Sequence, residues 1–166
     1  GNRTFLTTYA TAVVGKGDHR KALELYQQLL AGVERAPDLH LSIAHTYKTL
    51  GRSQEAIASY REAARQRPDF GDAYWSLANL KTYRFSDEEI TRMREAERAP
   101  GTALADRYHL CFALGKAYED RGDYGESFTF YERGNALKKS ESRYRPETTE
   151  TNARLQRQVC TAEFFA

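Results

Sequence analysis

Residues 37–70 read PDLHLSIAHTYKTLGRSQEAIASYREAARQRPDF, and this stretch decides the fold. Its apolar residues recur every three or four positions on both sides of Gly51, which predicts two amphipathic helices joined by a turn. Gly51 suits the left-handed backbone that ends the first helix, Ser53 can cap the second helix, and Pro68 stops it. Two helices with so short a turn must lie antiparallel. Each helix keeps apolar surface that the pair alone cannot cover.

The same pattern recurs along the chain, as expected of helix pairs that must stack on copies of themselves. Gly17 occupies the same turn position as Gly51, one period of 34 residues earlier. Gly122 marks a later copy, two periods and three residues beyond Gly51, so the intervening copy must contain a small insertion. In that copy we expect a first helix over residues 71–83, after which the turn glycine is missing and Ser86 opens a helix with a capping box. The sequence predicts repeats at about residues 3–36, 37–70, 71–104 (irregular) and 105–141.

The repeats share a small residue followed by an aromatic in the first helix, a turn glycine, and a small residue and an aromatic in the second helix. These positions hold Ala44 and Tyr47, Gly115 and Tyr118, Gly17, Gly51 and Gly122, Ala22 and Tyr26, Ala56 and Tyr60, Ser127 and Tyr131, with Pro68 closing one repeat. The pattern resembles the tetratricopeptide repeat (TPR) family. The resemblance implies an all-α fold over residues 1–141, a right-handed superhelix (α-solenoid) of about four helix pairs whose first helices line a concave groove.

Residues 142–166 are predicted to form a charged linker and a C-terminal helix. Pro146 suits the first turn of that helix, which we expect to run to about Cys160 and to cap the open end of the stack. The chain opens with Gly1 and not with Met, and it ends on Phe164-Phe165. We therefore expect it to be part of a longer protein that continues into something against which these rings pack.

Composition suits a helical protein and argues against several classes of function. The 25 basic and 23 acidic residues are interspersed, which indicates a solvated surface and no footprint for nucleic acid. No run approaches the roughly 20 apolar residues of a membrane span. Cys111 and Cys160 lack the spacing of a metal or redox site, and Cys111 falls where a small buried hydrophobe is expected. We predict no nucleic-acid partner, no membrane span, no metal or cofactor, and a reducing cytoplasmic setting.

Catalytic residues are not indicated by any motif. The glycines around Lys16 lack the spacing of a phosphate-binding loop. The acidic pairs Glu88-Glu89 and Glu119-Asp120 lie at predicted helix ends with no partner base. Spacing suggests neither a Ser/His/Asp set nor a Cys/His set. We predict that this chain is not an enzyme.

Residues predicted to bind a partner are those that helical spacing directs into the groove. The candidates are His45, Trp75, Asn79, Tyr83, Phe112 and Lys116. Two large aromatic side chains beside amide and ammonium donors suit recognition of a polypeptide segment. Packing of Trp75 into the core beneath Phe85 is the alternative. Some members of the resembled family clamp acidic C-terminal tails, but the matching positions of the first three repeats lack cations, and Asp72 would repel a carboxylate.

A second and narrower resemblance covers residues 71–166. Its most specific part is the run YWSLANLKTY at residues 74–83. The region resembles the one that precedes the catalytic domain in bacterial TPR-containing sulfotransferases, where a linker helix ending in Phe-Phe leads into that domain. The resemblance implies a scaffold for an enzyme that uses phosphoadenosine phosphosulfate. No phosphate-binding loop matches, so no catalytic residue is implied here.

The sequence leaves three interpretations of the module open. The first is an interaction or scaffold module whose partner is a polypeptide segment or the adjoining catalytic domain. The second is a free-standing adaptor unrelated to sulfation. The third is a homo-dimerisation module that uses the apolar end near Phe164 and Phe165.

Overall fold

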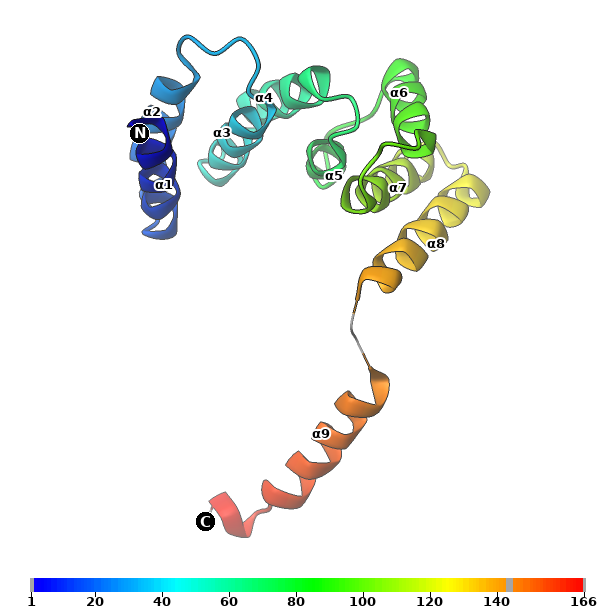
Figure 1. Ribbon diagram of the computed structural model, residues 1–166. Coiled ribbons are helices and arrows are strands. Elements are labelled where there is room, and N and C mark those ends of the chain that lie inside the picture. The colour runs from blue at the N-terminus through cyan, green and yellow to red at the C-terminus, as the bar shows by residue number, and fades with distance from the viewer. Residues whose placement is uncertain (1, 143–144, 166) are drawn as a thin grey trace.

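The computed structural model describes residues 2–142 and 145–165, and within them the regular structure is helical throughout (Figure 1). The elements are α1 (Asn2–Gly15), α2 (His19–Leu30), α3 (Pro37–Thr49), α4 (Ser53–Gln66), α5 (Gly71–Ala78), α6 (Asp87–Arg98), α7 (Leu104–Glu119), α8 (Tyr124–Glu141), α9 (Pro146–Val159) and the 3-10 turn η1 (Glu163–Phe165). The predicted all-α class is confirmed. Each helix among the described residues is too short or too polar to cross a membrane.

Three antiparallel pairs, α1/α2, α3/α4 and α7/α8, form at the turn glycines that the sequence identifies. Gly17, Gly51 and Gly122 have φ angles of 81°, 75° and 78°, a left-handed conformation that residues with a Cβ rarely adopt. Asp123 caps α8 by accepting a hydrogen bond from a backbone amide. Ser53 does not cap α4, in contrast to the prediction, because the helix already includes it.

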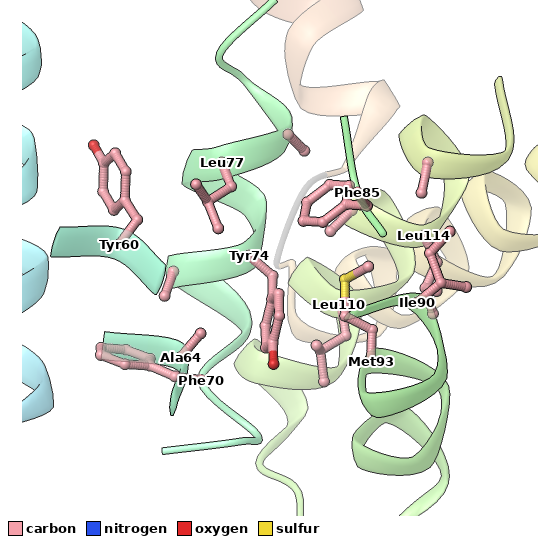
Figure 2. Packing of buried hydrophobic residues seen from close by; sticks show 14 of the residues in the cluster. Tyr60, Ala64, Phe70, Tyr74, Leu77, Phe85, Ile90, Met93, Leu110 and Leu114 are labelled. Carbon is pink, nitrogen blue, oxygen red and sulfur yellow. The ribbon is translucent and has the colours of Figure 1, made fainter. Parts of the chain in front are cut away.

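The central core is continuous from α3 to α8, and Figure 2 shows part of it. Tyr60 and Met93 are both fully buried, and Figure 2 shows Tyr74 and Leu77 between Tyr60 on one side and Met93 and Leu110 on the other. A smaller cluster joins α1 and α2 to α3. Burial of large side chains on both sides of α5 explains why the stack must extend over several pairs before it is stable.

The third pair departs from the repeat, as the insertion predicts, but not in the predicted way. We expected a first helix to Tyr83, whereas α5 ends at Ala78. The chain then turns so that Phe85 enters the core, where its exposed fraction is 7%. Helices α5 and α6 both pack on α7, and they approach each other less closely than the helices of the regular pairs do. The predicted capping box at Ser86 and Glu89 is confirmed.

The C-terminal helix α9 forms where it was predicted, but it does not cap the stack. None of its described residues is buried, and it extends away from α8 (Figure 1). Its large apolar residues, Leu155 and Val159, offer little area to bury. On the last helix of the stack, Tyr124 and Phe128 stay 71% and 68% exposed.

Replacing Gly71 with alanine should destabilise the fold, because a methyl group there meets the backbone carbonyl of Asp106 on α7. We expect a loss of about 1–3 kcal/mol in the free energy of unfolding, the usual cost of overpacking. Urea denaturation followed by circular dichroism measures it. Gly15→Ala is the matched control, since no atom lies near that methyl position. Equal stability of the two variants would contradict the close packing of α5 on α7.

The two thiols should react at very different rates with a thiol reagent. Cys111 is completely buried and its burial raises the pKa of the thiol to about 12, whereas Cys160 is exposed. Because the thiolate is the reactive form, we expect one fast thiol in the folded protein and two in denaturant. Two fast thiols without denaturant would show that α7 is not packed as described.

Candidate functional site

One side of the stack is formed by the first helices of successive pairs, α3, α5 and α7 (Figure 1). We call it the first-helix face, defined by the incompletely buried side chains Leu41, His45, Asp72, Trp75, His109 and Phe112. Residues on this side of α5 and α7 lie next to one another because these two helices pack together directly.

Trp75 and Phe112 meet at the centre of this face. Their ring centroids lie 5.4 Å apart with the planes tilted by 50°, an arrangement that aromatic pairs favour. Phe112 also rests on Gly134 of α8, where a Cβ would overlap its ring, and lies 6.2 Å from Tyr108. Both residues are half-buried, and Trp75 packs against the edge of the core. The two expectations for Trp75, core and surface, therefore each describe part of its side chain.

His45 joins the face to the buried Tyr60. The two side chains hydrogen-bond at 2.8 Å between His45 Nδ1 and Tyr60 Oη. Burial raises the pKa of Tyr60 to about 12, so its hydroxyl stays protonated at neutral pH and can donate a hydrogen bond to His45. Desolvation also lowers the pKa of His45, although the side chain remains exposed at the surface. The imidazole is thus neutral, with its own proton on Nε2.

Two of the other candidates lie at and beyond the early end of α5. Asn79 follows the last residue of the helix, and its side-chain amide donates to the carbonyl of Trp75 at 2.9 Å. Tyr83 lies on the turn beyond, with its ring 5.1 Å from Phe85 and its hydroxyl donating to Glu89 at 2.6 Å. The expectation of a continuous helix through Tyr83 is therefore wrong, because the chain turns after Ala78 and Phe85 enters the core.

Lys116 remains on α7, but its charge is already paired. Its ammonium group donates to Asp120 and lies 3.9 Å from Glu119. Arg84 reaches the same Asp120 carboxylate at 3.4 Å. Of the six predicted residues, the structure thus brings Trp75 and Phe112 into contact and places His45 on the same face.

Asp72 and His109 complete the face, and our candidate set omitted both. The Asp72 carboxylate accepts from the Ser76 hydroxyl at 3.4 Å, and its charge acts on both His45 and His109. Desolvation lowers the pKa of His109 as well. A sequence signal was present, because Asp72 lies three residues before Trp75 and His109 lies three residues before Phe112, on the same side of each helix.

A pocket of about 180 Å³ opens beside His45, between α1, α2 and α3. Its lining comprises Val14, His19, Tyr26, Ser42, His45, Thr46 and Thr49. The hydroxyls of Ser42, Thr46 and Thr49 each donate to a backbone carbonyl of α3.

Among the described residues, no group of three or more His, Cys, Asp or Glu side chains is placed to hold a metal ion. The arrangement of this face suits contacts to aromatic, apolar and hydrogen-bonding groups.

Acidification should destabilise the protein, because partial burial lowers the pKa of His40, His45 and His109. The unfolded chain then binds protons more readily, so their contribution is present above about pH 6.5 and is lost as the pH falls through the lower folded-state values. Urea denaturation at several pH values measures the slope. His45→Gln keeps an acceptor for Tyr60 and should flatten the slope, and an unchanged slope would contradict this assignment.

Comparison with known proteins supports the fold described above. Family models of the tetratricopeptide repeat match residues 14–80 and 108–141. Solved structures with a similar fold include MamA, with a TM-score of 0.61 and 15% identity, covering 86% of this chain and 82% of that one. A search of curated proteins finds no significant match.

Two further solved structures are longer than this chain. The crystal structure of BtubC (BKLC) from P. vanneervenii has a TM-score of 0.60 and 19% identity, covering 87% of this chain and 66% of that one. The structure of pilF from Pseudomonas aeruginosa has a TM-score of 0.62 and 17% identity, covering 81% and 60%. The chain thus spans less than two thirds of either protein's length, 66% and 60%, and the likeness concerns the fold alone. The matches in both halves of the chain, together with the stacked pairs and their turn glycines, show that it belongs to the tetratricopeptide repeat family.

Proposed function

We propose that this chain is a non-catalytic polypeptide-binding module that holds its partner on the first-helix face. The observation that supports this most directly is the contact between Trp75 and Phe112, which presents two rings at the centre of the face without burying them completely. Aromatic side chains in such positions dominate the energy of many protein interfaces. Repeats of this family stack into extended surfaces of the size that a polypeptide segment needs.

We further propose that the module is the N-terminal, non-catalytic part of a sulfotransferase. The proposal is supported by the sequence resemblance over residues 71–166, with the run at residues 74–83 as its most specific part. It is also supported by the exposed tail, in which Phe164 and Phe165 are 65% and 74% exposed and contact only each other's rings among the described aromatic residues. In this proposal the tail packs on the catalytic domain, and the first-helix face binds the partner in the cytoplasm.

The apolar tail favours homo-dimerisation as a second candidate function. Leu155 and Val159 on α9 are 50% and 58% exposed, and the rings of Phe164 and Phe165 in η1 are more exposed still. Sedimentation at several protein concentrations tests this candidate, and a strict monomer with the tail intact would exclude it.

Binding of a partner should depend on Trp75. Replacement of Trp75 by alanine removes the largest aromatic side chain of the first-helix face, and loss of a central aromatic residue costs about 2 kcal/mol or more at such interfaces, roughly thirtyfold in affinity. A pull-down with the wild-type chain as bait, beside Trp75→Ala, identifies proteins lost with this side chain.

Phe128→Ala is the matched control, because it removes an exposed aromatic ring of α8 from outside the first-helix face. A partner retained by Phe128→Ala and lost by Trp75→Ala supports the proposed face. A partner lost equally with both variants, or with neither, would contradict it.

A further inference from the structure

We propose that the first-helix face selects a polypeptide with a cationic side chain, lysine or arginine, held between the indole of Trp75 and the carboxylate of Asp72. This inference rests on the proposed function, since it names the chemistry of the partner at the same face. The two residues lie three positions apart on α5, so they are neighbours on one side of the helix.

Asp72 has no cation of its own. It is half-buried, its side chain accepts only the 3.4 Å hydrogen bond from Ser76, and it forms no ion pair within the described parts of the chain. A carboxylate that is partly removed from water gains from a charged partner. The position is therefore prepared for a cation from outside.

The surrounding basic groups do not satisfy this carboxylate. The charge of Asp72 acts on His45 and His109, and desolvation lowers the pKa of both, which keeps them neutral at pH 7. On α8, Lys138 donates to Tyr108 and Glu141. On α3, Lys48 influences His45 but forms no ion pair among the described residues.

The nearby acidic groups add to the negative charge. Arg67 forms ion pairs with three carboxylates, those of Asp106 at 2.6 Å, Asp69 at 3.7 Å and Asp38 at 3.9 Å. One arginine therefore leaves a net negative charge beside the first turn of α5, next to Asp72. Because opposite charges attract, a basic segment is favoured here and an acidic one is repelled.

The aromatic pair supplies the second half of the recognition. A lysine or arginine within about 6 Å of an indole face is attracted by the ring, and the attraction grows when water is excluded. Phe112 packs against the indole, with the ring centroids 5.4 Å apart. An apolar side chain at this place would desolvate Asp72 without compensation.

Trp75 is the only tryptophan of the chain, so its fluorescence reports on this site directly. We would titrate the protein with end-blocked hexalysine, hexa-arginine and hexaglutamate at low salt. The cationic peptides should give a saturable change in emission, and hexaglutamate should give none. Asp72→Asn should weaken cation binding about fivefold, as expected for a partly exposed ion pair, whereas Asp72→Glu should largely restore it.

Glu95→Gln is the matched control, because it removes an exposed carboxylate of α6 that has no ion-pair partner among the described residues. No change with either cationic peptide, or equal affinity of the Asp72→Asn and Glu95→Gln variants, would overturn the inference. A cellular partner that depends on Trp75 but binds Asp72→Asn normally would overturn it as well, while leaving the proposed function intact. If instead the partner did not depend on Trp75, the proposed function itself would fail.

Discussion

The direct packing of α5 on α7 is the constraint on which the rest of the structure depends. The backbone amide of Gly71 donates to the Asp106 carboxylate at 3.0 Å, and the helices approach so closely there that only glycine fits. The regular repeats pair each first helix with its own second helix. In the third repeat α5 packs on α7 rather than closely on its own second helix, α6, and Phe85 from the connection is buried in the core. The same approach brings Trp75 and Phe112 together.

Local signals were sufficient to predict most of the fold. Turn glycines require positive φ, capping boxes need residues three apart, and amphipathic stripes need a period of 3.6, so all can be recognised within one helix pair. The early end of α5 could not be predicted, because it follows from a tertiary event, the burial of Phe85 against α6 and α7. The helical pattern continues past Ala78, but the core overrides it.

The candidate site, too, could be predicted from the sequence only where local helical spacing decides the position of a side chain. Trp75 and Phe112 could be predicted because they occupy equivalent positions of two first helices, and equivalent positions in a stack face the same side. Asn79 and Tyr83 could not be placed without knowing where α5 ends. The pairing of Lys116 with Asp120 was available in the sequence, because residues four apart on a helix are neighbours. Helical spacing also directs Asp72 into the groove, but it was used to argue against acidic ligands and was not among the six candidates.

The most direct test of this account is a double-mutant cycle between Trp75 and Phe112, measured by urea denaturation. Each residue is replaced by alanine alone and both are replaced together, so that the coupling separates their contact from their individual burial. A favourable coupling of about 0.5–1.5 kcal/mol would match an aromatic pair held between α5 and α7. A coupling near zero would show that the two rings are independent, and it would contradict a shared binding face at this point of the stack.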